Sequence, residues 1–89
     1  MNTWKNLEVW YGNQKSYYGK AKVCSVMGRV FLKSYDTTVA MITEDGHFIR
    51  MWDGYSPTTA RHINSFRVMF GLNPIRKAEW DKMEVGVAV

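Results

Sequence analysis

The chain has 89 residues, of which 46% are hydrophobic, and this length predicts a single compact domain over residues 1–89. Its one cysteine excludes an intramolecular disulfide and a zinc site made of several cysteines. The net charge of +4 either serves solubility or favours an anionic partner, and no segment approaches the ~20 apolar residues of a membrane span.

The first half of the chain predicts three strands. The segments with strand-like composition are residues 4–11, 21–26 and 29–35. Residues 12–19 read as a loop, and Met27-Gly28 lies where a two-residue turn would join the second and third strands. A tight turn at Tyr35-Asp36 is also required, because a slip of one residue would move every following side chain to the other face.

The pair Asp45-Gly46 is the strongest turn signal in the chain. It lies between two apolar runs, which predict strands over residues 37–44 and 47–52. Asp-Gly is favoured in a two-residue hairpin turn because both turn positions need a positive φ. We therefore expect a β-hairpin centred on this pair.

The residues after the hairpin predict a helix with defined ends. Ser56 can accept hydrogen bonds from free backbone N–H groups, and Pro57 suits the first helical position, where its missing N–H costs nothing. Gly71 suits a left-handed stop after a helix over residues 56–70. A second turn or short helix is expected over residues 73–83.

These elements predict an α+β fold: an antiparallel sheet of four to five strands, covered on one face by a long helix and a short C-terminal helix. By helical periodicity, the residues that face the sheet are Thr59, Ile63, Phe66 and Phe70. The residues that face outward are Arg61, Asn64, Ser65 and Val68, with His62 at the border. The sheet residues expected beneath the helix are Val23, Val30, Leu32, Val39, Met41 and Trp52.

The opposite face of the sheet is the predicted binding surface, because it gathers cations and aromatic rings. In this register it carries Lys20, Lys22, Cys24, Arg29, Phe31, Lys33 and Tyr35, with Tyr17 and Tyr18 nearby. Lys22 would lie directly across from Lys33, and like charges that face each other lower the stability of a sheet. An anionic group outside the chain would compensate for this repulsion.

Three interpretations of this face stay open. Rings among lysines and arginines can stack bases and hold phosphates, as in single-strand-binding sheets. The same residue types are enriched at protein–protein hot spots, and they also occur on solvated faces without a partner. The alternative binding face is the outer helix surface of Arg61, Asn64, Ser65 and Val68.

The sequence predicts no catalytic residues, no metal site and no cofactor, and we expect no enzymatic activity. Cys24 lies in mid-strand, where small apolar cysteines usually pack. His47 beside the hairpin turn is expected to be solvated, and His62 on the helix is expected to orient the helix on the sheet. The two histidines do not have the spacing of a zinc site, and the isolated glycines form no phosphate-binding loop.

Three parts of the chain also carry a family resemblance. They are Tyr18-Gly19-Lys20-Ala21, then Leu32-Lys33-Ser34-Tyr35-Asp36-Thr37 with Val39-Ala40, and Tyr55-Ser56-Pro57-Thr58-Thr59 with Arg61-His62-Ile63-Asn64 and Phe66. Over about residues 17–83 the chain resembles a family of small, mostly uncharacterised proteins carried by phages and mobile elements of Gram-positive bacteria. The resemblance implies no catalytic residues. It implies a small accessory protein of a phage or mobile element, of a kind that often binds and blocks a host factor. The single cysteine and the lack of an apolar span favour a location in the cytoplasm, here that of the bacterial host.

We therefore expect a binding module that inhibits or modulates a host protein. The specific expectation is an anti-defence inhibitor of the anti-CRISPR kind, directed at a nucleic-acid-guided nuclease or another defence factor. Inhibitors that imitate nucleic acid are acidic, whereas this chain is basic, so it would block an acidic or regulatory surface or contact bound nucleic acid. The alternative is a small DNA- or RNA-binding regulator that uses the basic aromatic face. A third class, a structural virion or assembly protein, would form a stable homo-oligomer.

Overall fold

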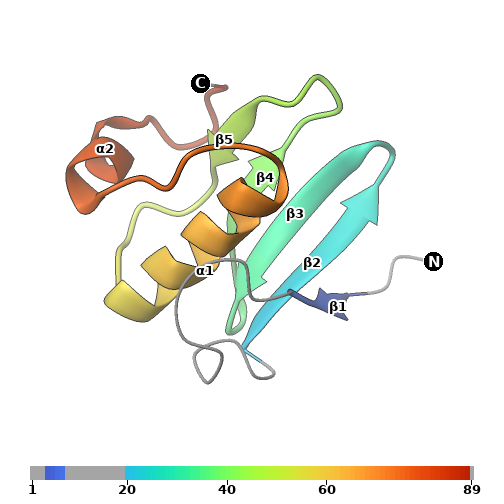
Figure 1. The fold of residues 1–89 in the computed structure, drawn as a ribbon, viewed down its shortest axis with the longest axis horizontal. Helices are drawn as coiled ribbons and strands as arrows, with labels where there is room; N and C mark the ends of the chain where they lie inside the picture. Colours follow the sequence, from blue (N-terminus) through green and yellow to red (C-terminus); the bar gives the residue numbers. More distant parts are fainter. Residues whose placement is uncertain (1–3, 8–19, 89) are drawn as a thin grey trace.

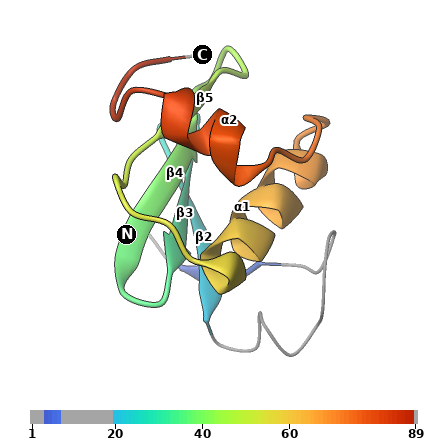
Figure 2. The same cartoon turned by 90° about the vertical axis from the view of Figure 1, so that its left-hand side faces the viewer.

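The computed structural model of the chain describes residues 4–7 and 20–88. It has a five-stranded antiparallel sheet with the strand order β1-β2-β3-β4-β5 and two helices on the same side of that sheet (Figures 1 and 2), which confirms the predicted α+β class. The elements are β1 (Lys5–Asn6), β2 (Ala21–Val26), β3 (Arg29–Ser34), β4 (Thr37–Ile42), β5 (Phe48–Arg50), α1 (Pro57–Met69) and α2 (Lys77–Lys82). Within the described residues, neither helix is long and apolar enough to span a membrane.

Two of the strand connections have the predicted length. Met27 and Gly28 join β2 to β3 with φ values of 51° and 82°, so both turn residues have the left-handed conformation of a two-residue hairpin turn. Tyr35, with a φ of 57°, begins the two-residue turn that joins β3 to β4. The turn lengths set the register, so Lys22 lies directly across from Lys33 as predicted.

The third connection differs from the prediction of a two-residue turn at Asp45-Gly46. The N–H of Thr43 donates to the carbonyl of His47 at 2.9 Å, so three residues, Glu44-Asp45-Gly46, form the loop. Only Gly46 has a positive φ, of 88°. Three-residue hairpin loops usually end in one left-handed residue. The Thr43 hydroxyl stabilises this wider loop by accepting from the N–H of His47 at 3.0 Å.

Met41 lies on the face of the sheet opposite to the one predicted. The register shifts between Leu32 and Lys33, where a β-bulge adds an extra residue, Val39, to β4. Beyond the bulge, Met41 pairs with Phe31 on the face away from the helices, so its predicted place beneath α1 is wrong. The other five residues predicted there do belong to the core or pack against it: Val23, Val30, Leu32, Val39 and Trp52.

Helix α1 begins and ends where the sequence predicts. The Ser56 hydroxyl accepts a hydrogen bond from the N–H of Thr59 at 3.1 Å, and Pro57 occupies the first turn. At the other end, Gly71 has a φ of 79° and its N–H donates to the carbonyl of Val68, while the N–H of Leu72 donates to that of Arg67. This pair of bonds is a Schellman motif, which ends a helix by satisfying its last carbonyls.

The side chains of α1 are buried on a wider surface than predicted, so the predicted outer surface of this helix is wrong. Asn64 is 6% exposed and Ser65 is fully buried, whereas Arg61 is exposed and Val68 is partly exposed. Asn64 is covered because the segment before α2 packs on it: its side-chain amide donates to the carbonyl of Ile75 at 3.1 Å and accepts from the N–H of Ile75 at 2.8 Å. The four residues of the alternative binding face therefore do not form one exposed surface.

Phe70 also differs from the prediction, because it was expected to face the sheet. It is 40% exposed, and its ring packs edge-on against the ring of Phe66 at 5.2 Å between centroids. Phe70 is the C-cap of α1 and has left the helical conformation, so helical periodicity no longer places its side chain.

A buried arginine holds α2 and the C-terminal segment against β5. The Arg50 guanidinium donates to the carbonyls of Trp52, Trp80 and Met83 at 2.7, 2.9 and 3.1 Å. It also lies over the Trp80 ring, 4.6 Å from the centroid. Its positive charge is stabilised at the C-terminal end of α2, where the Trp80 carbonyl accepts from it in addition to the N–H of Met83. The C-terminal segment then forms single bridges to β5 at Val85 and Ala88.

The N-cap of α1 provides a stability test of the fold. We expect Ser56→Ala to lower the free energy of unfolding by about 0.5–2 kcal/mol, because the N–H of Thr59 loses its acceptor. Thermal unfolding followed by circular dichroism measures the difference, with the exposed Ser25→Ala in β2 as the matched control. Equal melting curves for the two variants would contradict this account of the helix start.

Candidate functional site

The candidate site is the sheet face opposite α1 and α2, which we call the lysine face. Neighbouring side chains of a strand point to opposite faces, so the strand residues between the core residues share this one. The lysine face consists of Trp4, Asn6, Lys22, Cys24, Val26, Arg29, Phe31, Lys33, Thr38, Met41 and Ile49. Four of these were predicted as binding residues on this face: Lys22, Arg29, Phe31 and Lys33.

The register arranges these residues in rows that cross the strands. The first row contains the directly opposed pair Lys22 and Lys33. Two positions along the strands, successive Cα partners form an apolar row from β2 to β5: Cys24, Phe31, Met41 and Ile49. Arg29 lies beyond that row, next to the turn between β2 and β3. An apolar row thus separates a pair of ammonium groups from a guanidinium.

The lysine pair has one compensating contact inside the fold. The Lys33 ammonium lies over the ring of Trp4, 4.4 Å from the centroid. A cation–π contact at an exposed site contributes about 0.5–1 kcal/mol. The repulsion of two like charges directly opposed on a sheet is of similar size, about 0.2–1 kcal/mol. The Trp4 ring therefore offsets the repulsion at Lys33.

The charges on this side of the sheet have an order. None of the strands β1 to β5, as described, carries an aspartate or glutamate. The turn between β4 and β5 carries two, Glu44 and Asp45, and both are exposed. The turn between β3 and β4, next to the lysine row, carries one, Asp36. With two lysines to one carboxylate, the lysine face is therefore net basic at the Lys22–Lys33 row and acidic beyond its other end.

At this acidic end, the turns enclose a groove of about 510 Å³. The residues that line it are Met27, Arg29, Thr43, Glu44, Asp45, His47 and Ala88. The two turns approach closely, since a Cβ placed on Gly28 would lie 2.5 Å from a carboxylate oxygen of Glu44. His47 is exposed at the rim, as predicted.

The remaining predicted binding residues lie elsewhere. The Tyr35 ring is 6.0 Å from the ring of the α1 residue His62, so Tyr35 lies on the helix side and is not grouped with the lysine pair. Lys20 is exposed just before β2, and its carbonyl accepts from the N–H of Tyr35 at 2.6 Å. Tyr17 and Tyr18 lie outside the described residues.

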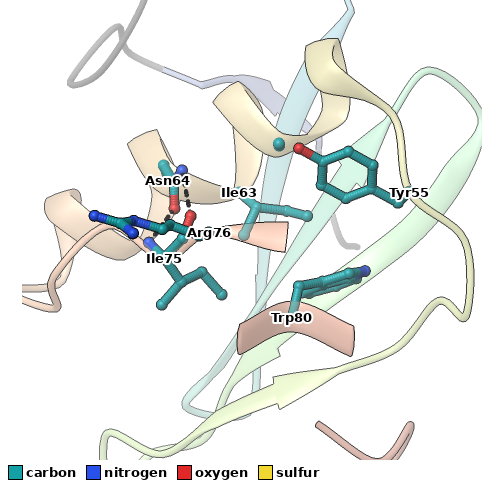
Figure 3. A pocket seen from close by; sticks show the side chains of 7 residues that line it. Tyr55, Ile63, Asn64, Ile75, Arg76 and Trp80 are labelled. Atoms are coloured by element: carbon teal, nitrogen blue, oxygen red, sulfur yellow. Dashed lines mark hydrogen bonds between the residues drawn. The ribbon is translucent and has the colours of Figure 1, made fainter. Parts of the chain in front are cut away.

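A second hollow, between the two helices, is too small for a ligand. It lies between α1, Tyr55 and α2 (Figure 3), and the Asn64–Ile75 hydrogen bonds close one side of it. Its volume is about 10 Å³. A cavity of roughly 10–15 Å³ holds a single water molecule. This hollow is therefore a packing defect beside Trp80 and gives no binding site.

A buried polar cluster joins α1 to β3. The Ser34 hydroxyl lies 2.8 Å from Nδ1 of His62 and 2.9 Å from the Thr59 hydroxyl. All three side chains are buried, so the Ser34 oxygen has no path to a substrate, and the cluster fixes the position of the helix on the sheet. Cys24 is also buried, in the apolar row. Among the described residues, no three His, Cys, Asp or Glu side chains are close enough together to bind a metal ion.

Sequence reasoning missed three residues of importance. Trp4 joins the lysine face because β1 pairs with β2 at the edge of the sheet, and the ring is found only through its contact with Lys33. Met41 joins it because of the β-bulge. Arg50 had one available signal, a charged residue inside an otherwise apolar strand, which often marks a buried and paired group.

Comparison with protein families places the chain in one of them. A model described as "Family of unknown function (DUF8033)" matches residues 5–82, so the chain belongs to this family. The match covers all five strands and both helices. No curated protein and no solved structure matches the chain.

Proposed function

We propose that this member of a family of unknown function is a binding module whose lysine face docks on an acidic surface of a host protein. One observation carries the proposal: Lys22 and Lys33 lie directly opposite each other on the sheet face away from the helices. Such a pair gives the sheet no net stability, because the Trp4 contact only offsets the repulsion, and it becomes favourable when a partner supplies carboxylates. The two partly exposed members of the apolar row, Phe31 and Met41, supply apolar contact area of the kind that protein interfaces need at their centre.

The biological role that we propose is anti-defence. The sequence resembles small proteins of phages and mobile elements, which often block host factors, and a basic face suits an acidic or regulatory surface of a nucleic-acid-guided nuclease. The net charge of +4 argues against imitation of nucleic acid. In this role the chain would act as an inhibitor by occupation of a surface and not as an enzyme.

A removal of the two lysines tests the binding proposal. We expect Lys22→Ser with Lys33→Ser to change the melting temperature little, because the loss of the Trp4 contact and the relief of repulsion nearly cancel. We expect the same variant to lose about 1–3 kcal/mol of partner affinity if the pair lies at a desolvated centre. Immobilised protein is incubated with nuclease-treated bacterial lysate, and retained proteins are quantified by mass spectrometry.

The matched control removes two positive charges elsewhere. Lys5 and Lys82 are exposed and lie off the lysine face, so Lys5→Ser with Lys82→Ser should retain the same host protein as the wild type. If both double variants retain the host protein as well as the wild type does, the binding site does not lie on the lysine face. A partner that disappears after nuclease treatment would favour the alternative function.

The anti-defence role has a separate test in cells. In a host with an active nucleic-acid-guided nuclease, expression of the wild-type chain should raise the plating efficiency of a targeted phage by more than tenfold. The Lys22→Ser, Lys33→Ser variant should not, because it no longer docks. An unchanged plating efficiency with a stably expressed wild-type chain would exclude inhibition of that nuclease.

The second candidate function is a small regulator that binds single-stranded nucleic acid. One observation favours it: the Phe31 ring and the Trp4 ring lie on the same face as the two lysines. Rings and cations on a sheet can stack bases and hold phosphates. We rank it second because the Lys33 ammonium already occupies one face of the Trp4 ring, which leaves Phe31 as the accessible stacking platform.

A further inference from the structure

The order of charges along the lysine face carries an inference about the occupant, which rests on the proposed function. From the lysine row, the face continues through the apolar row to Arg29 and then to the groove between the two turns. In that groove one guanidinium, from Arg29, faces two carboxylates, from Glu44 and Asp45. The face is thus cationic at one end, apolar in the middle and net anionic at the other end.

We propose that the occupant is an amphipathic protein segment that lies along the strands, with carboxylates over Lys22 and Lys33, apolar side chains over the partly exposed Phe31 and Met41 of the apolar row, and a basic residue in the groove. Opposite charges at the two ends fix the direction of such a segment. Nucleic acid fits less well, because a chain of regular phosphates would place negative charge against Glu44 and Asp45.

The length of the face sets the length of the segment. Lys22 and Met27 are five residues apart on β2 and its turn, which is about 17 Å at the rise of roughly 3.3 Å per strand residue. An extended segment of about five residues, or a helix of about eleven, covers this distance. A short linear segment or one exposed helix of a larger protein is therefore sufficient.

Met27 gives a second, independent observation at the groove. It is 90% exposed and has a φ of 51°, a backbone conformation that suits Asn or Gly much better than Met. The turn needs this conformation, but Asn would adopt it at a lower cost, and the apolar side chain gains nothing from its contact with water. The choice of Met is explained if the flexible thioether, which lines the groove, packs against the apolar part of the bound segment.

A peptide selection tests the proposal and does not require the partner to be identified first. A phage-displayed library of random twelve-residue peptides is panned against the immobilised wild-type chain, with the Lys22→Ser, Lys33→Ser variant as the counter-selection. We expect enriched peptides to share an acidic end, an apolar centre and a basic end. The best peptide is then synthesised with a fluorescent label and titrated at physiological salt by anisotropy.

Each feature of the face has its own variant. We expect the peptide to bind at least tenfold more weakly to Lys22→Ser with Lys33→Ser. It should bind about threefold to tenfold more weakly to Glu44→Gln with Asp45→Asn, and this loss should disappear when the basic residue of the peptide is replaced by serine. Met27→Asn should weaken binding and raise the melting temperature. Lys5→Ser with Lys82→Ser is the control and should bind as the wild type does.

The outcomes separate this inference from the proposed function. If no peptide is enriched, or if Glu44→Gln with Asp45→Asn binds every peptide as tightly as the wild type, the proposed segment is overturned. A labelled oligothymidine of twenty nucleotides is titrated as well. If it binds the wild type more tightly than any selected peptide does, and binds more weakly to Lys22→Ser with Lys33→Ser, the face is a binding site but its occupant is nucleic acid. If neither ligand depends on Lys22 and Lys33, both proposals fail.

Discussion

Replacement of Trp80 by alanine is expected to lower the free energy of unfolding by about 3–5 kcal/mol, the usual range for a large aromatic residue removed from a core. Trp80 is only 2% exposed and belongs to the core cluster, although it comes from a helix of six residues. Its ring packs against Phe48 at 6.4 Å between centroids, and its Nε1–H donates to the carbonyl of Gly54 at 2.8 Å. Alanine loses the ring, the hydrogen bond and the stacked Arg50 guanidinium.

The matched variant is Trp80→Phe, which keeps a ring in the core and removes only the Nε1–H donor and part of the volume. For a domain of 60–100 residues, about 1 kcal/mol shifts the melting temperature by roughly 4–8 °C. We therefore expect Trp80→Ala to melt at least about 12 °C below the wild type and Trp80→Phe to lie between the two. A smaller loss for Trp80→Ala than for Trp80→Phe would mean that α2 does not close the core.

The helix caps and the turn between β2 and β3 are the part of the fold that sequence reasoning predicts well, whereas the loop at Asp45-Gly46 is one residue longer than predicted. Ser56, Pro57 and Gly71 act through the backbone within a few residues, so their effect does not depend on the tertiary structure. The turn at Met27-Gly28 likewise fixes the register of β2 and β3 by its length alone, which is why the Lys22–Lys33 pair could be predicted.

Two of the errors, at Met41 and at Asn64, come from contacts with distant parts of the chain. Val39 is an ordinary apolar strand residue between Thr38 and Ala40, so nothing in the sequence marks it as the extra residue of the bulge that turns Met41 to the other face. Asn64 is polar and reads as exposed. It is buried because its side-chain amide pairs with the backbone of Ile75, eleven residues away, and a helical wheel does not contain that contact.

The candidate site shows the same division. Lys22, Arg29, Phe31 and Lys33 follow from strand alternation once the register is known. Trp4 required the pairing of β1 with β2, and the acidic end required the packing of one turn against another, seen at Gly28 and Glu44. Sequence reasoning therefore found the cations of the face but not the order of charges along it.

The second large effect is expected at Arg50, which is 6% exposed. Three backbone carbonyls, from Trp52, Trp80 and Met83, accept hydrogen bonds from its guanidinium. Hydrogen bonds to charged groups contribute about 1.5–3 kcal/mol each, and buried acceptors left without a donor are costly. Because water can replace some of these bonds, we expect Arg50→Ala to lower the free energy of unfolding by about 3 kcal/mol.

Arg67 provides the matched control, because it is also an arginine over an aromatic ring. Its guanidinium lies 4.7 Å from the Phe48 centroid, but it donates to one carbonyl, that of Asn73, and is only partly buried. Burial lowers the pKa of Arg67, which nearby Glu79 opposes, and the group stays charged at physiological pH. We therefore expect Arg67→Ala to cost about 1 kcal/mol. Equal losses for the two variants would show that the three carbonyls are satisfied without Arg50.

The Arg50 variant also separates stability from binding at the lysine face. Arg50 and its neighbour Ile49 point to opposite faces of β5, so Arg50→Ala leaves the chemistry of the lysine face unchanged. In Arg50→Ala, hydrogen exchange should be faster for the backbone amides of α2 than for those of β2 and β3. It should also be faster for the N–H of Gly86, which donates to the carbonyl of residue 50. Below the melting transition, the selected peptide should bind Arg50→Ala as tightly as the wild type. A large loss of affinity in the folded variant would mean that α2, and not the lysine face, holds the partner.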